Sequence, residues 1–185
     1  MEDTIFALSS GAPPAAIGVI RISGPKAADA LAALAGDLPP ARSPRVRTLR
    51  DYAGELLDVA LVLWFPGPAT ATGEDLAEIH CHGGRAVVAA IAAALGRLEG
   101  LREAEPGEFT RRAFNNGRID LAEAEGLADL LAAETDLQRK GALLSAGGAL
   151  SRQIESWREQ ILGLAASVEA VIDFADEDDV AGLPA

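Results

Sequence analysis

The chain has 185 residues, of which 49% are hydrophobic and 24% charged, as in an ordinary soluble globular protein of one or two domains. Its net charge of −12 is unevenly placed: residues 1–119 carry 12 Lys and Arg against 14 Asp and Glu, whereas residues 120–185 carry 4 against 14. The second region would therefore repel a phosphate backbone, so any RNA contact must come from the first region or from protein outside this sequence.

The first region alternates short β-branched runs with two alanine-rich helical runs. Its pattern predicts strands at residues 17–23, 46–52, 56–65, 75–81 and 101–104, and helices at residues 26–35 and 85–98. Sequential hairpins with two crossover helices are typical of an α+β fold. We therefore expect a two-layer sandwich of the split-βαβ type.

The second region has a helical pattern. Asp120, followed by Glu123, predicts the N-cap of a helix over residues 121–134. A longer helix is predicted from about Leu137 to near Phe174. Its apolar residues recur in steps of four and three, which is typical of a coiled-coil seam; they are Leu150, Ile154, Trp157, Ile161, Leu164, Val168 and Val171.

This seam needs partner helices along its whole length, and one short helix cannot cover it. The partners must come from other chains or from downstream segments. The sequence ends at Ala185 without an obvious terminal element. We interpret the chain as truncated; a frayed natural tail is the alternative.

Cellular location is predicted by what the sequence lacks. Cys81 is the single cysteine, which excludes an intrachain disulfide and fits a reducing compartment. The N-terminus has no signal-like apolar run, and the longest apolar stretch, residues 56–65, is too short to span a bilayer. We therefore expect a cytoplasmic protein with no membrane segment.

The most unusual stretch for chemistry is residues 78–84. On a strand, Glu78, His80 and His82 would share one face, and the two glycines that follow would let the chain turn into a helix. Spacing alone favours a tight turn with structural histidines over a pocket for an acidic or amide-rich small molecule. A zinc site is disfavoured because no further ligands stand out.

Two other places could bind a ligand. Arg21 lies within an apolar strand, where a charge must point outward or pair with a ligand or a carboxylate. Residues 106–121 are polar and aromatic and link the two regions, as binding segments often do; the alternative is a plain linker with Arg111 and Arg112 on a solvated face. The sequence has no phosphate-binding Gly-x-x-x-x-Gly-Lys motif and no Ser/His/Asp arrangement, so we predict no catalytic residue.

Taken together, several short motifs resemble the MnmE (TrmE) family of tRNA-modification GTPases. The resemblance is collinear from residue 3 to about residue 178. It is carried by residues 3–5, 18–24, 63–68, 72–75, 82–84, 102–110, 112–121, 124–130 and 172–174.

The resemblance implies that residues 1–118 form a homodimerising domain similar to tetrahydrofolate-binding aminomethyltransferase domains. Residues 119–185 would be the first helices of a truncated helical domain. In the family, the whole protein acts with the flavoprotein MnmG on tRNA. It supports a carboxymethylaminomethyl-type modification at carbon five of the wobble uridine.

Parts of that activity would lie outside this chain. The GTPase domain, with its GTP, potassium and magnesium, and the C-terminal cysteine are missing, so the chain should have no GTPase activity. The alternatives are a stand-alone dimerisation module or a folate-dependent aminomethyltransferase-like protein. The uncovered seam disfavours the former, and the lack of an assignable acid or base beyond Glu78 disfavours the latter.

The resemblance places the folate contacts at Arg21, Glu78 and Arg118. We predict no metal-binding residue in this chain, because no further ligands stand out beside the histidines. The ligand would be 5-formyltetrahydrofolate or a related reduced folate. A carboxylate can accept hydrogen bonds from the N–H edge of a pteridine, and an arginine can pair with the glutamyl carboxylate of a folate.

Overall fold

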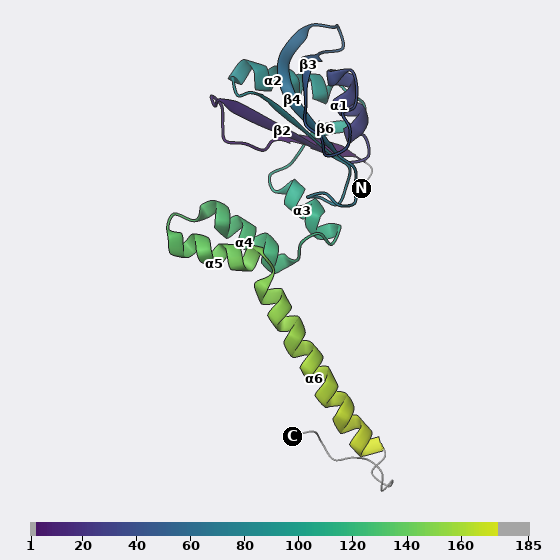
Figure 1. Ribbon diagram of the computed structural model, residues 1–185, viewed down its shortest axis with the longest axis vertical. Helices are drawn as coiled ribbons and strands as arrows, with labels where there is room; N and C mark the ends of the chain where they lie inside the picture. Colours follow the sequence, from purple (N-terminus) through teal and green to yellow (C-terminus); the bar gives the residue numbers. More distant parts are fainter. Residues whose placement is uncertain (1–2, 174–185) are drawn as a thin grey trace. The chain divides into compact units, whose positions relative to one another are not determined.

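The computed structural model describes residues 3–173, and the chain divides into two compact units, Met1–Ile119 and Asp120–Ala185 (Figure 1). Within the described residues, no helix has the length and apolar character needed to cross a membrane.

The first unit is built on a mixed sheet of six strands, and the expected α+β class is confirmed. The spatial order is β3-β4-β5-β2-β1-β6, with β1 and β6 parallel and the other neighbours antiparallel. The strands are β1 (Thr4–Leu8), β2 (Ile17–Ser23), β3 (Arg45–Arg50), β4 (Leu56–Phe65), β5 (Leu76–His82) and β6 (Leu101–Glu103). Because β5 lies between β2 and β4, these two strands run in the same direction, which is the split-βαβ arrangement.

Helices α1 (Ala27–Ala35) and α2 (Arg85–Gly96) cover one face of this sheet and form the main core with it. Alternate strand residues face the helices, as the pleat of a strand requires. The core residues include Ile20, Ile22, Ala60, Val62, Trp64, Ala77, Ile79 and Cys81 from the strands and Leu31, Leu34, Ile91 and Leu95 from the helices. Burial of each Val, Leu or Ile side chain among them contributes about 1.5–3 kcal/mol to stability. The residues between them, including Arg21, Glu78 and His80, therefore face the other side of the sheet.

That second face is covered at one end only. Helix α3 (Glu108–Asn115) and the loop between β4 and β5 lie over it. Ile5 and Leu76 are buried there although they are not part of the main core. Elsewhere the face is open and apolar: Ile17, Val46, Val59 and Leu61 are 36–64% exposed.

Two elements of the first unit were missed by the sequence pattern. The N-terminal segment is strand β1, and the segment expected to be a linker contains helix α3. The predicted strand 46–52 extends two residues too far, because Asp51 Oδ1 accepts N–H groups of Ala53 and Glu55 at 2.9 Å each and closes a hairpin turn.

The second unit contains α4 (Leu121–Ala132), α5 (Asp136–Ala146) and α6 (Ala149–Asp173). The predicted cap is confirmed: Glu123 N donates to Asp120 Oδ1 at 2.8 Å, and Asp120 N donates to Glu123 Oε2 at 2.9 Å. The prediction of one long helix from Leu137 is wrong. The helix breaks at Gly147-Gly148, where Gly148 adopts a φ of 70° that favours glycine.

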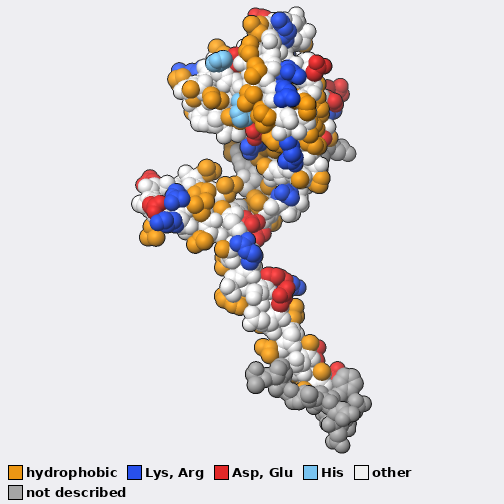
Figure 2. Space-filling view, in the orientation of Figure 1, with side chains coloured by type: hydrophobic (Ala, Val, Ile, Leu, Met, Phe, Trp, Pro, Cys, Tyr) orange, Lys and Arg blue, Asp and Glu red, His pale blue; other side chains and the backbone are white. Residues whose placement is uncertain are grey.

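Helix α6 has 25 residues, and none of them is buried. The seven seam residues are 36–65% exposed, and Figure 2 shows hydrophobic side chains along this helix. Within residues 3–173, the seam is thus uncovered. Phe174, where the helix was predicted to stop, and the acidic run after it lie outside the described residues.

Candidate functional site

Arg21 and Glu78 are brought together by strand register. Arg21 on β2 lies directly opposite Glu78 on β5, and both face away from α1 and α2. Arg21 Nη2 and Nε donate to Glu78 Oε1 at 2.8 and 3.1 Å. His80, two residues along β5, places its Nε2 atom 3.1 Å from Glu78 Oε2. The Glu78 carboxylate therefore has partners on both oxygens.

The surroundings keep this carboxylate ionised. The Glu78 side chain is 16% exposed, and this burial tends to raise its pKa. Hydrogen bonds from His80 and Arg21, together with their charges, outweigh the burial and hold the pKa below its usual range. At neutral pH, Glu78 is an acceptor only, on the sheet face that points away from α1 and α2.

Arg118, the third predicted contact, is held elsewhere. It is exposed, and its Nε donates to the backbone oxygen of Thr70 at 3.0 Å, in the loop between β4 and β5. Among residues 3–173, no hydrogen bond or ion pair joins Arg118 to Arg21 or Glu78. The structure thus brings two of the three residues together.

Phe109 is a site residue that sequence reasoning missed. It lies on α3, and the guanidinium of Arg21 is 6.0 Å from the centre of its ring, within range of a cation–π contact. The aromatic character of residues 106–121 was the available signal. Without the helix, however, nothing indicated which strand its aromatic residues would reach.

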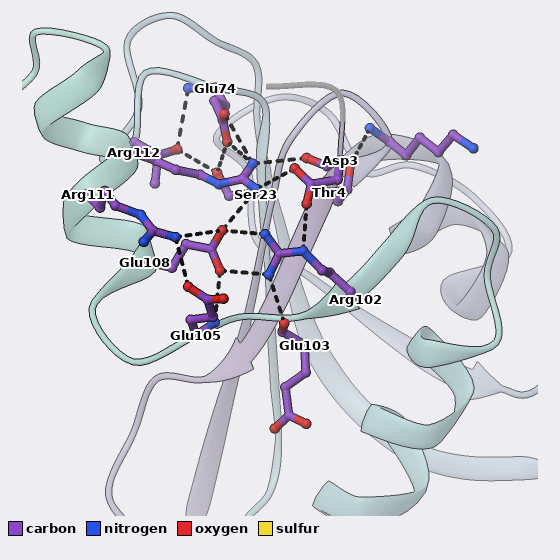
Figure 3. A network of polar contacts seen from close by, with 12 residues as sticks. Asp3, Thr4, Ser23, Glu74, Arg102, Glu103, Glu105, Glu108, Arg111 and Arg112 are labelled. Atoms are coloured by element: carbon purple, nitrogen blue, oxygen red, sulfur yellow. Dashed lines mark hydrogen bonds and ion pairs between the residues drawn. The ribbon is translucent and has the colours of Figure 1, made fainter.

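A network of charged residues anchors α3 to the sheet (Figure 3). Arg112 is fully buried and donates to Asp3 Oδ1 at 2.8 Å and to Glu74 Oε2 at 3.0 Å. Glu74 in turn accepts from Ser23 Oγ on β2 at 2.8 Å. The alternative of a solvated face holds for Arg111, which is exposed. It is wrong for Arg112, which is fully buried and forms ion pairs with Asp3 and Glu74.

Glu108, in the first turn of α3, is the other fully buried charge of this network. Arg102 donates to both of its oxygens, and Glu105 N donates to Oε2 at 2.8 Å. The hydrogen bonds from Arg102 outweigh the effect of burial and lower the pKa of Glu108 to about 2. The network therefore ties α3, β6 and the N-terminal segment together through ionised groups.

The two histidines bind different carboxylates. His80 contacts Glu78, whereas the backbone N–H and Nδ1 of His82 both lie 2.8 Å from the Asp58 carboxylate. Burial opposes ionisation of Asp58, but the hydrogen bonds from His82 lower its pKa. Within residues 3–173, no group of three or more His, Cys, Asp and Glu side chains is arranged to hold a metal ion.

The turn after β5 depends on a close backbone approach. Gly83 accepts from Ala15 N at 3.0 Å and donates to Ala16 O at 3.3 Å, and a Cβ atom at this position would lie 2.5 Å from Ala15 O. Only glycine fits against the loop before β2. The turn thus fixes the end of the strand that carries Glu78 and His80.

Comparison with known proteins covers both units. The family described as GTP-binding protein TrmE N-terminus matches residues 4–118, and the MnmE helical domain matches residues 121–184. Three relatives, each named tRNA modification GTPase MnmE, come from Erythrobacter litoralis, Novosphingobium aromaticivorans and Rhizorhabdus wittichii. They are 68%, 67% and 64% identical over 96–98% of this chain, which covers 41–42% of each relative. The chain thus spans about two fifths of their length.

Proposed function

Since the chain belongs to the MnmE (TrmE) family, we propose that it is the N-terminal part of a tRNA-modifying GTPase, in which residues 1–118 bind a reduced folate and form a homodimer. The proposal extends to the similarity of this domain to tetrahydrofolate-binding aminomethyltransferase domains. The single observation that carries the folate site is the ionised Glu78 carboxylate, held by Arg21 and His80 in the middle of an accessible sheet face.

Glu78 has the chemistry to bind a pteridine. The amino and ring N–H groups of a pteridine are donors, and an ionised carboxylate accepts such bonds more strongly than a neutral group does. A carboxylate offers about four acceptor positions, and Arg21 and His80 use three of them. Among the described residues, one position on Oε2 is therefore free, and a two-point contact requires His80 to turn away.

Arg118 has the chemistry to bind the acidic end of a folate. A guanidinium has five N–H donors, and the Arg118 side chain makes a single hydrogen bond among the described residues. Its remaining donors can form a two-point contact with the glutamyl carboxylate. Because Arg118 is exposed and anchored through Nε alone, it can pivot toward a ligand without breaking the core.

The proposed homodimer is supported by the open part of the sheet face. Ile17, Val46, Val59 and Leu61 leave apolar surface exposed beside the Glu78 site. A second copy placed on this face would remove that surface from water at about 25 cal/mol per Å². The α6 seam is a separate apolar surface, for other helices of the assembly.

The remaining activity belongs to the longer protein. We propose that the whole protein is cytoplasmic and works with MnmG on the wobble uridine of tRNA, with GTP, potassium and magnesium in a domain outside this chain. The alternative of a stand-alone aminomethyltransferase-like or dimerisation module is less well supported. Both consecutive domains of the larger family match this chain in order.

Isothermal titration calorimetry with 5-formyltetrahydrofolate tests the folate site. The informative variant is Glu78→Gln, and Glu55→Gln, an exposed hairpin carboxylate, is a control with the same charge change. Loss of a hydrogen bond to a charged group costs about 1.5–3 kcal/mol, so Glu78→Gln should bind about tenfold to a hundredfold more weakly. Equal binding by wild type and Glu78→Gln, or no binding by the wild type, would refute the proposal.

A further inference from the structure

We propose that an arginine-rich edge of the sheet binds the phosphate backbone of the tRNA. This arginine edge consists of Arg42, Arg45, Arg47 and Arg50, on β3 and the segment before it. The inference rests on the proposed role in tRNA modification and adds to it a surface for the RNA.

The arginine edge stands out by its uncompensated charge. Residues 42–50 contain four arginines and no Asp or Glu, in a chain whose net charge is −12. Arg21, Arg102, Arg111 and Arg112 of the same unit all form ion pairs. None of the four edge arginines forms one with any residue from 3 to 173.

The four side chains remain available to a ligand. Each donates to a backbone oxygen only: Arg42 to Ala69, Arg45 to Pro44, Arg47 to Val46 and Arg50 to Gly54. Their other guanidinium N–H groups are free among the described residues, and a guanidinium fork matches a phosphate. Arg42, Arg45 and Arg50 are exposed, and Arg47 is half-buried.

Strand geometry sets two of these charges, Arg45 and Arg47, side by side. Arg45 and Arg47 lie opposite Val62 and Ala60 on β4, so they share one side of the strand, about 7 Å apart along it. Strand β3 is the outermost strand of the described sheet, and no strand within residues 3–173 pairs with its outer side. Figure 2 shows Lys and Arg side chains in a row on the visible face of this unit, over the strands labelled β3 and β4 in Figure 1.

Negative charge elsewhere in the chain repels RNA, so the arginine edge is the favoured surface for binding a phosphate backbone. Residues 120–185 carry a net charge of −10. Within residues 3–173, the other arginines of the first unit without ion pairs are Arg85, Arg97 and Arg118. Arg85 begins α2, Arg97 is its C-cap, and Arg118 follows α3, so they form no comparable run in the sequence. Strand β3 is two strands from β5, so the arginine edge lies about 10 Å from the strand that carries Glu78. The two sites are therefore separate but share one unit.

Charged residues on an edge strand also have a simpler role, because they prevent edge-to-edge pairing with another chain. That role does not require four adjacent charges of one sign. It also makes a different prediction: removing the charges should promote aggregation without changing RNA binding.

The test compares Arg45→Gln/Arg47→Gln with Arg139→Gln/Lys140→Gln. The control removes the same charge from α5, where both cations are paired with Asp136. Binding of a fluorescent, unmodified tRNA transcript is measured by anisotropy from about 50 to 200 mM salt, the range over which phosphate contacts lose most of their affinity. Titration of the same proteins with 5-formyltetrahydrofolate serves as an independent readout.

We expect the β3 variant to bind tRNA at least about tenfold more weakly at 50 mM salt, with the control within about twofold of wild type. The slope of log affinity against log salt should fall by about 1.4–1.8 for two lost phosphate contacts. Folate binding should not change. Equal tRNA binding by the β3 variant and wild type overturns the inference, as does a wild type that binds folate but not tRNA. A wild type that fails to bind folate instead refutes the proposed function.

Discussion

The buried carboxylate of Glu108 provides a quantitative test of what holds α3 in place. We expect Glu108→Gln to destabilise the first unit, because a neutral amide would leave Arg102 and the N–H of Glu105 poorly matched. A carboxyl group whose pKa falls from 4.5 to about 2 on folding contributes about 3 kcal/mol. Breaking a buried ion pair costs 3–5 kcal/mol in general. Arg102 is 42% exposed and can turn to solvent, so we expect the lower value, about 3 kcal/mol.

The stabilisation of the first unit by Glu108 should depend on pH. Folding lowers the pKa of Glu108. The contribution of Glu108 to the free energy of unfolding is therefore complete above pH 4.5 and is lost as the pH falls toward 2. Urea unfolding followed by the fluorescence of Trp64, which is buried in the core, measures both effects. The exposed Glu105→Gln is the control and should change stability by less than about 0.5 kcal/mol. A Glu108→Gln variant as stable as wild type at pH 7, or a difference that persists unchanged at pH 3, would refute this account.

Three further changes test the site and the assembly. Arg118→Gln should weaken 5-formyltetrahydrofolate binding about tenfold in calorimetry, whereas Arg97→Gln, on the opposite face, should not. His80→Ala should leave folate affinity within about threefold of wild type at pH 7. The pH below which folate affinity is lost should rise, because the pKa of Glu78 rises when one hydrogen bond is lost. An unchanged dependence of folate affinity on pH would contradict this. Ile161→Glu should reduce self-association in analytical ultracentrifugation if the α6 seam joins chains, and equal association would exclude that role.

The sequence was sufficient for the parts of the fold that follow an apolar pattern. The alternation in β5 predicted that Glu78 and His80 share one face of the sheet, and the capping box at Asp120 was predicted from two residues. The direct pairing of Arg21 with Glu78 could not be predicted, because the two residues meet only through the register of two strands more than 50 residues apart. Pairing with a carboxylate was one of the options for Arg21.

Helix α3 and strand β1, which the apolar pattern of the sequence did not predict, are held in place by polar contacts. Helix α3 is anchored by Arg112 and Glu108, which a hydrophobic pattern assigns to solvent although both are fully buried. Strand β1 is a short N-terminal segment whose position depends on pairing with β2 and β6. The break before α6 depends on the conformation of Gly148, and the heptad spacing beyond it gave no sign of the interruption.

The most direct test of the central claim is a crystal structure of this chain with 5-formyltetrahydrofolate. We expect the pteridine on the open sheet face, with its N–H groups about 2.7–3.2 Å from the Glu78 carboxylate, a normal hydrogen-bond distance, and His80 turned away from Oε2. A folate bound instead in the apolar cavity between β1 and α2, lined by Phe6, Val88 and Ala92, would contradict it.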